Sequence, residues 1–168
     1  MPAEQTYVLE LEPLAPALLP IPTGLRIVRL ADFPDEPDTR RRLYALVRQG
    51  VLDTPGHQGD FETFEVFSDH IFGPSYWEEA DSQLLALDDT NWVGLTSLRR
   101  TEIPQQSAFG LTVVLPSHRR RGLALALKQQ AVSLARRRGD RTIITKVHPN
   151  NAAMRAVNTR LGFRPQIQ

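Results

Sequence analysis

The densest group of residues that could do chemistry is the run Arg119–Ala124, which reads RRRGLA. A valine-rich strand pattern precedes the run and a helical pattern begins at its end, so it lies at a strand-to-helix junction. There the first backbone N–H groups of the helix are unpaired, and the helix dipole adds about half a positive charge. Gly122 lets an anion reach the backbone, and the three arginines add cationic side chains. The run therefore predicts an anion site suited to a pyrophosphate.

Other interpretations of the run are weaker. A basic cluster is often only a solvated turn, but the strand before it, the glycine and the apolar helix after it favour the anion site. A Walker-type phosphate loop is excluded because no Gly-Lys-Ser/Thr sequence follows. The dinucleotide fingerprint is excluded because its three spaced glycines are absent.

The elements that must position this run follow from the spacing of apolar residues, prolines and glycines. Strands are predicted over 5–11, 24–30, 82–88, 91–100, 108–115 and 142–147, with a short one starting at Phe163. Helices are predicted over 38–49 and 61–72, from Leu123 to a stop at Gly139, and over 151–161. Four prolines between 13 and 22 predict an extended connector. Strands and helices alternate in the second half, which predicts α/β layers around a mixed sheet.

Several positions within these elements carry specific expectations. Gly50 is expected to stop the first helix, and Gly73-Pro74 the second. In the long helix after the run, Lys128 and Gln129 are expected to face water. The apolar stripe opposite them consists of Leu123, Leu127, Ala131 and Leu134. The aromatic side chains expected in the core rather than in a pocket are Phe61, Phe64 and Phe67.

Composition narrows the class of protein. The chain has 168 residues, 41% hydrophobic and 23% charged, as is typical of one globular domain. There are no cysteines, and the four histidines show no metal-ligand spacing, so neither disulfides nor a metal is expected. The net charge of +1 argues against a nucleic-acid partner. No apolar run approaches the roughly 20 residues that cross a bilayer, and no secretory signal is recognisable. We therefore expect no membrane association and a cytoplasmic location.

Two segments resemble the GCN5-related N-acetyltransferase (GNAT) superfamily. Arg119, Gly122 and Ala124 occupy the defined positions of its Gln/Arg-x-x-Gly-x-Gly/Ala motif, and Val114-x-Pro116 precedes them as in the family. The block Asn151–Phe163 (NAAMRAVNTRLGF) is similar to a second conserved block, in the form found in the mycothiol-synthase-like branch. The resemblance implies an α/β fold with a mixed, mostly antiparallel central sheet, a splayed strand pair and helices on both faces.

The resemblance also implies acetyl-CoA as co-substrate and transfer of its acetyl, or another acyl, group to an amine. In this family the strand before the motif splays from its neighbour, and the pantetheine arm pairs with it. The matching residues here are Thr112, Val113, Val114 and Leu115. The backbone amides that would hold the pyrophosphate are those of Arg120, Arg121, Gly122, Leu123 and Ala124. The side chains of Arg119 and Arg121 are expected to help, while that of Arg120 could equally face water.

Two asparagines of the second block lie seven residues apart, on one helix face. Asn151 fits a helix cap and a cofactor contact about equally well. Asn158 lies beside an apolar stripe, where an amide needs a partner, and is expected to bond the pantetheine arm or the sulfur. Many family members carry a tyrosine there, which protonates the leaving thiolate, whereas an asparagine cannot supply a proton. Water, a remote tyrosine or a thiolate that leaves unprotonated would then be required.

The implied mechanism is direct attack of an amine on the thioester in a ternary complex. The backbone N–H of Val114 is expected to stabilise the oxyanion. Glu102 is the candidate base for the amine proton, chosen by location together with Asp88, Glu62 and Glu65, although each is more typical of a solvent-facing carboxylate. The alternative function is a module of the same fold that binds acyl-CoA without transferring the acyl group, because the tyrosine is missing.

The acceptor is expected to be an amine of a small molecule or a peptide. The acetyltransferase domain is predicted over 24–168, after an N-terminal extension over 1–23 that holds the first strand and the connector. Few residues follow Phe163, which leaves a sheet edge to be covered by the strand over 5–11 or by a partner chain. The second alternative predicts a homodimer.

Overall fold

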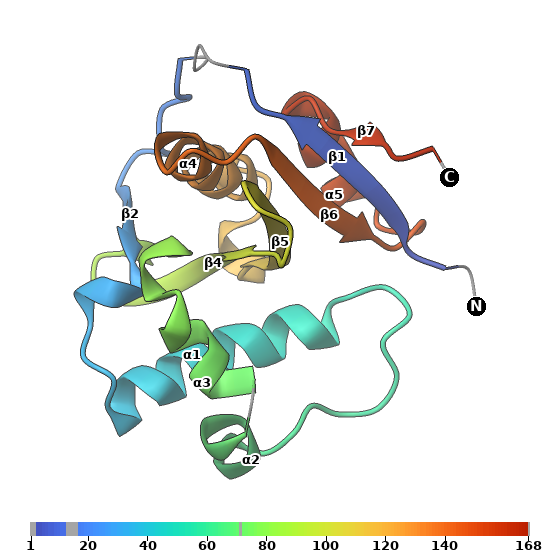
Figure 1. Ribbon diagram of the computed structural model, residues 1–168. Coiled ribbons are helices and arrows are strands. Elements are labelled where there is room, and N and C mark those ends of the chain that lie inside the picture. Colours follow the sequence, from blue (N-terminus) through green and yellow to red (C-terminus); the bar gives the residue numbers. More distant parts are fainter. Residues whose placement is uncertain (1–2, 13–16, 71, 168) are drawn as a thin grey trace.

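Seven strands form one sheet in the computed structural model, which describes residues 3–12, 17–70 and 72–167 (Figure 1). They are β1 (Gln5–Glu10), β2 (Leu25–Arg29), β3 (Gln83–Asp88), β4 (Asn91–Arg100), β5 (Gln106–Val114), β6 (Thr142–Val147) and β7 (Arg164–Pro165). Their order is β2-β3-β4-β5-β6-β1-β7; β5 and β6 run parallel, and the other neighbouring pairs are antiparallel. The predicted mixed, mostly antiparallel sheet is confirmed. Residues 13–16 of the predicted connector, Ile71 and Gln168 lie outside the described residues.

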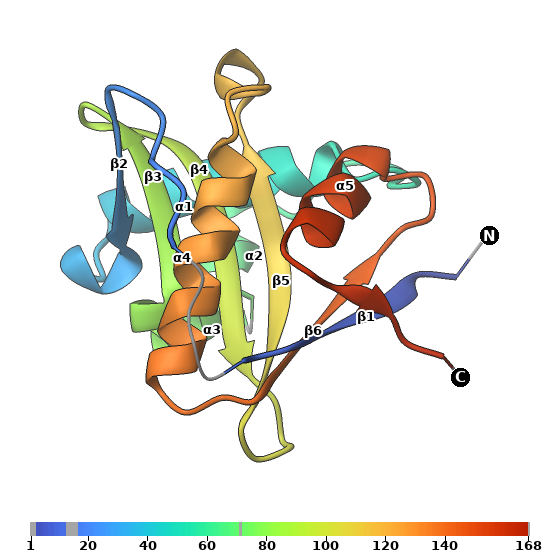
Figure 2. The ribbon, with the colours of Figure 1, turned by 90° about the horizontal axis from the view of Figure 1, so that it is seen from above.

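Helices cover both faces of the sheet, as Figure 2 shows. They are α1 (Pro37–Leu52), α2 (Phe64–Asp69), α3 (Phe72–Glu78), α4 (Leu123–Arg137) and α5 (Ala152–Arg160), with short 3-10 turns at Leu30–Asp32, Ala80–Ser82 and Pro116–His118. Helix α4 packs on β3, β4 and β5, and α1 packs on the opposite face with α2 and α3 beside it. Two clusters of buried side chains fill these layers, and Phe67 lies in the second, as expected. Within the described part of the chain, every helix is too short or too polar to span a lipid bilayer.

Gly50 lies inside α1, so the prediction that it ends this helix is wrong. The helix continues to Leu52. A Cβ atom at position 50 would lie 2.8 Å from the Cβ of Val113. The missing side chain therefore allows α1 to approach β5 closely, and this packing outweighs the roughly 1 kcal/mol that a glycine costs within a helix.

The predicted helix over 61–72 is wrong in its bounds. The chain forms α2 from Phe64 and a separate α3 from Phe72, and Gly73-Pro74 lies in the first turn of α3. A proline is tolerated there because the N–H that it lacks would have no partner in a first turn. Helix α2 begins where it does because the hydroxyl of Thr63 accepts the N–H of Val66 at 3.3 Å.

Lys128 is buried in α4, with only 1% of its surface exposed, which corrects the prediction that it faces water. It lies on a second buried stripe of the helix, together with Leu125, Val132 and Ala135. The sheet covers one side of α4, and Met154 of α5 contacts Lys128 from another. Helix α4 therefore has a wider buried face than its first apolar stripe indicates.

The first strand of the chain fills the sheet edge beside β6. Strand β1 pairs antiparallel with β6, from Gln5 opposite Val147 to Glu10 opposite Thr142, and with β7 on its other side. Of the two predicted ways to cover this edge, the strand of the chain itself is the one observed. The segment 1–23 thus contributes a strand to the sheet, and the domain boundary after residue 23 stays a prediction.

Candidate functional site

Strands β5 and β6 pair along only part of their length. The parallel register runs from Gln106 opposite Thr142 to Phe109 opposite Thr145 and then ends. Directly after Phe109, two residues of β5, at positions 110 and 111, lie opposite one residue of β4, which makes a bulge. A bulge bends its strand, so β5 turns away from β6, and Figure 2 shows the two strands diverging. The predicted splayed pair is confirmed, and β5 is its first member.

The free segment of β5 directs backbone groups into this gap. The N–H of Leu115 donates to the carbonyl oxygen of Val93 at 2.9 Å, so Leu115 faces β4. Backbone direction alternates along an antiparallel ladder, so Val113 also faces β4, whereas the backbone groups of Thr112 and Val114 face the gap. The N–H of Val114, the predicted oxyanion donor, therefore points toward the opening.

A cavity of about 590 Å³ lies on this side of β5, between the free segment of β5, the end of α1, the start of α4 and α5. Its wall consists of Gly50, Asp53, Thr54 and Pro55 from the end of α1, Thr112–Val114 from β5, His118–Arg120 and Gly122–Leu125 around the start of α4, and Asn151, Ala153, Met154, Ala156, Val157 and Arg160 beside or within α5. Most of the predicted cofactor contacts thus meet at one cavity. The predicted residues that do not line it are Leu115, Arg121 and Asn158.

The run Arg119–Ala124 forms the mouth of the cavity, where α4 begins. Gly122 precedes the helix with φ of +80°, in the left-handed region that favours glycine. The N–H of Ala126 donates to the carbonyl oxygen of Gly122 at 3.0 Å and is the first of the helix to find an acceptor. Within the described part of the chain, no acceptor reaches the N–H groups of residues 120–125. These amides are free to bind an anion.

Arg119 ties the mouth to its surroundings. Its Nε donates to the carbonyl oxygen of Val114 at 2.8 Å, and its Nη2 bonds the carboxylate of Asp53 at the end of α1. A hydrogen bond from Gln49, and then the Arg119 guanidinium, hold the pKa of Asp53 below its ordinary value. Arg119 therefore fixes the ends of β5 and α1 relative to each other.

The other two arginines differ from the expectation. Arg120 lines the cavity, with a backbone φ of +61°. Arg121 lies outside the cavity wall, and its Nη2 donates to the carbonyl oxygen of Thr23 at 3.3 Å. The structure thus brings Arg119 and Arg120 to the cavity, rather than the expected pair of Arg119 and Arg121.

The two asparagines of the second block have different surroundings. Asn151 is the N-cap of α5, where its Oδ1 accepts the N–H of Met154 at 3.1 Å, and it also lines the cavity. Asn158 is fully buried behind the wall, where its Oδ1 accepts from Nζ of Lys128 at 2.5 Å. Its Nδ2 is buried and has no hydrogen-bond partner within the described residues. The predicted helix cap at Asn151 is confirmed, whereas its cofactor contact and the sulfur contact of Asn158 stay predictions.

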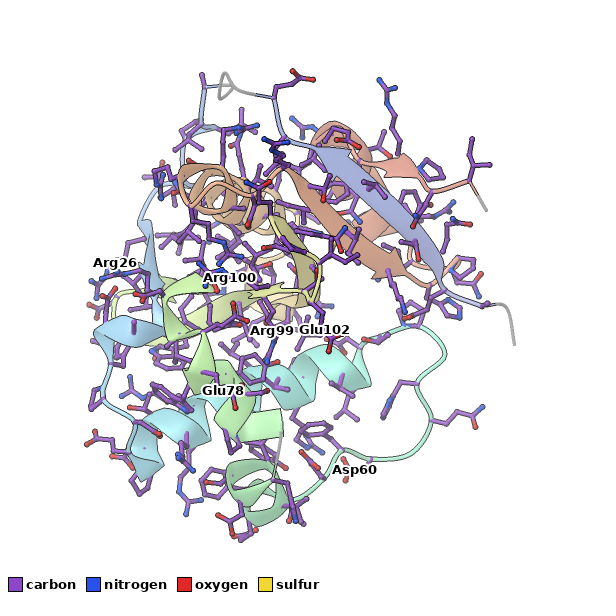
Figure 3. All side chains as sticks on the ribbon, viewed as in Figure 1. Arg26, Asp60, Glu78, Arg99, Arg100 and Glu102 are labelled. Atoms are coloured by element: carbon purple, nitrogen blue, oxygen red, sulfur yellow. The ribbon has the colours of Figure 1, made fainter. Side chains whose placement is uncertain are left out.

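Glu102 lies away from the cavity. It is exposed in the loop between β4 and β5, at the end of β5 opposite to Val114. Figure 3 labels it with Arg99 and Arg100, where β4 ends. The structure therefore does not bring this candidate base to the wall. Asp88, another candidate base, bonds Nε2 of His118 at 2.7 Å, and His118 lines the cavity.

Three features of the site were not predicted from the sequence: the close approach at Gly50, the wall residues Asp53–Pro55, and Lys128 behind the wall. A glycine inside an apolar helical pattern is a signal of close packing. The glycine at position 110, inside a strand pattern, is a signal from which the bulge could have been predicted. Among the residues that the structure describes, no group of three or more His, Cys, Asp or Glu side chains could hold a metal ion.

Known structures share this architecture. A GCN5-related N-acetyltransferase from Sphaerobacter thermophilus is 24% identical, with a TM-score of 0.77 over 99% of this chain and 50% of that one. The putative acetyltransferase yncA from Salmonella typhimurium, solved with acetyl-CoA, is 18% identical, with a TM-score of 0.67 over 87% and 83% of the two chains. Diaminobutyrate acetyltransferase from Paenibacillus lautus, in complex with L-2,4-diaminobutyric acid and coenzyme A, is 23% identical, with a TM-score of 0.58 over 82% and 74%. No curated protein matches the sequence.

These identities show a shared fold, and the chain spans about half the length of the Sphaerobacter protein. The family follows from the sequence itself. The model of the acetyltransferase (GNAT) family matches residues 54–163, which include both splayed strands, the cavity mouth and α5. The chain with this open strand pair and its free helix amides belongs to the acetyltransferase (GNAT) family.

Proposed function

We propose that the protein transfers an acetyl, or another acyl, group from acetyl-CoA to an amine by direct attack in a ternary complex. The observation that carries this proposal is the gap between β5 and β6. Beside this gap, one cavity of about 590 Å³ brings together the backbone groups of Thr112 and Val114 and the free amides of residues 120–125. A thioester, its pantetheine arm and its pyrophosphate need these three features.

The residues around the gap have separate roles in this proposal. The amides of residues 120–124 and the side chain of Arg120 bind the pyrophosphate. The segment 112–115 runs beside the pantetheine arm, and Arg119 holds its end in place. The N–H of Val114 stabilises the oxyanion that forms when the amine nitrogen attacks the thioester carbon. The C–S bond then breaks, and the sulfur leaves with the electron pair. Glu102 as the base for the amine proton stays a prediction.

The finer assignments also belong to the proposal. The form of the block Asn151–Phe163 supports a place in the mycothiol-synthase-like branch. Diaminobutyrate acetyltransferase, which was solved with a small amine, and a ribosomal-protein-S18-alanine N-acetyltransferase from Escherichia coli have similar folds, so a small molecule and a peptide both stay candidate acceptors. Strand β1 occupies the edge that suggested a homodimer, so the dimer stays a prediction without structural support. The cytoplasmic location also stays a prediction.

The test is a titration with acetyl-CoA, followed by calorimetry, together with an assay of free coenzyme A thiol over a panel of amino acids, diamines and short peptides. We expect binding with a Kd on the order of 1 μM to 1 mM, and release of coenzyme A that depends on at least one amine. Tight binding with no release on any amine would favour the module that binds acyl-CoA without transfer. Absence of binding would contradict the proposed function.

A further inference from the structure

Lys128 is a buried amine in an uncharged environment. Its side chain is 1% exposed, and no carboxylate among the described residues forms an ion pair with it. Burial lowers the pKa of Lys128 to about 7. The only other lysine in the sequence, Lys146, is exposed on β6. A buried, unpaired lysine is costly, so its position calls for a physical reason.

The contacts of Lys128 place it at the closed end of the gap. Its Nζ lies 4.2 Å from the centre of the Phe109 ring and 5.6 Å from that of Phe163. Phe109 is the last residue of β5 that pairs with β6. The Nζ also lies 2.5 Å from Oδ1 of Asn158 and 3.8 Å from the sulfur of Met154. Lys128 thus joins α4 to α5 at the point where the two strands separate.

The two polar atoms of the Asn158 side chain differ in their hydrogen bonding. Its Oδ1 accepts from Lys128, which fixes the orientation of the amide, and its Nδ2 is buried with no partner in the described part of the chain. An unsatisfied buried donor is unfavourable and calls for an explanation, such as a ligand that completes the site. Met154, one turn earlier on α5, lines the cavity and contacts Nζ of Lys128. The pair Lys128–Asn158 therefore lies directly behind the cavity wall.

We propose that Lys128 is a positioning residue whose ammonium group holds Oδ1 of Asn158 and thereby keeps the Nδ2–H of Asn158 free to donate to the sulfur of bound acyl-CoA when the thioester displaces Met154 at the cavity wall. This inference rests on the proposed function. As the C–N bond forms and the C–S bond breaks, the sulfur gains the electron pair. The amide N–H and the nearby positive charge stabilise this thiolate, and neither gives up a proton. The amine proton goes to solvent, directly or through a base, and the thiolate leaves unprotonated, so the pair replaces the tyrosine that many family members use.

The test measures the pKa of the coenzyme A thiol bound to the protein, from the ultraviolet absorbance of the thiolate. In the wild type we expect this pKa to lie below the free value of roughly 8.5. Lys128→Met should raise the pKa of the bound thiol by about one unit or more, which corresponds to a tenfold change. Asn158→Asp keeps an acceptor for Lys128 but removes the N–H and adds a negative charge, so it should raise this pKa as well. Lys146→Met, the matched control, should leave it unchanged.

Turnover gives a second readout that a merely structural role would not produce. We expect kcat to fall about tenfold or more in Lys128→Met and in Asn158→Asp, with KM for acetyl-CoA within about twofold of wild type. If Lys128→Met does not fold, Asn158→Asp still carries the test, because it retains the buried pair. Two results would overturn the inference: a wild-type thiol pKa at or above the free value, or a thiol pKa and kcat that are unchanged in both variants. In either case, binding of acetyl-CoA would still support the proposed function. Failure of the wild type to bind coenzyme A would overturn both.

Discussion

At the open end of the cavity, three consecutive arginines are exposed in a turn, whereas at the closed end one lysine is buried between aromatic rings and an amide. The exposed arginines remain hydrated, so they add positive charge beside the free backbone amides at little cost in stability. Lys128 has lost its water and holds a single oxygen of Asn158. In low dielectric such a charge acts strongly on whatever lies near it, but it destabilises the fold that contains it.

This difference separates two tasks of the site. The open end can provide affinity for a polyanion, because several weak donors act together there. The closed end can act on a reacting atom, because its donor is already desolvated and oriented. Changes at the open end should therefore alter binding, and changes at the closed end should alter turnover and the pH dependence of stability.

The largest effect is expected from Gly122→Glu at the open end. A carboxylate about 4 Å from the pyrophosphate costs about 4 kcal/mol at an effective dielectric constant of 20, so the affinity for acetyl-CoA should fall about a thousandfold. The protein should stay folded, because a Cβ at this position meets no described atom within 4 Å. Gly122→Gln shares the backbone strain at φ of +80° but not the charge, and should lose at most about tenfold. Calorimetry measures both, and wild-type affinity in the glutamate variant would contradict the anion site.

The next effect concerns stability and pH at the closed end. Burial lowers the pKa of Lys128 to about 7 from 10.5, so between these values the unfolded chain binds more protons than the folded one. The free energy of unfolding of the wild type should therefore rise relative to that of Lys128→Met, by about 3 kcal/mol from pH 7 to pH 9.5. Urea denaturation at both pH values measures this change. Lys146→Met should follow the wild type, and a constant difference between wild type and Lys128→Met would show that Lys128 titrates normally.

A smaller effect is expected where α1 supports the cavity. In Gly50→Ala the new Cβ would lie 2.8 Å from the Cβ of Val113 and 3.0 Å from a methyl group of Leu111, so β5 or α1 must shift. Overpacking of this kind costs about 1–3 kcal/mol, partly offset by the roughly 1 kcal/mol that alanine gains in a helix. Thermal denaturation should show a net loss, with weaker acetyl-CoA binding because Val113 lines the cavity. A more stable variant would mean that the two elements do not touch closely at this point.

The smallest effect should distinguish the arginines of the open end. Arg120→Ala should weaken acetyl-CoA binding about fivefold, or about 1 kcal/mol, because Arg120 lines the cavity, whereas Arg121→Ala should change it less than about twofold. The loss in Arg120→Ala should shrink as salt is raised, because exposed charges are screened. Equal losses in both variants would contradict the different placement of the two side chains.

Much of the local structure could be predicted from neighbouring residues alone. The strand over 142–147 has the predicted bounds, and the chain turns at Asp89–Thr90, between the strands predicted over 82–88 and 91–100, with Asp89 at φ of +55°. The start of α4 after Gly122 also follows from a short segment, because a left-handed residue and an apolar period suffice to set it. The open end of the cavity therefore depends on residues that are adjacent in the chain.

The closed end depends on contacts that no short segment contains. The sequence pattern predicts a helix stop at Gly50, but Gly50 is the point where a helix meets a strand more than 60 residues later in the chain. Lys128 looked solvated because one stripe of α4 was already apolar, and only the packing of α5 and Phe109 covers its other side. Whether a side chain is buried depends on the elements that pack against it. The sequence by itself thus determined the strand-to-helix junction at Gly122 and the family, whereas the tertiary structure decided which amine is desolvated and which strand, β1, completes the sheet.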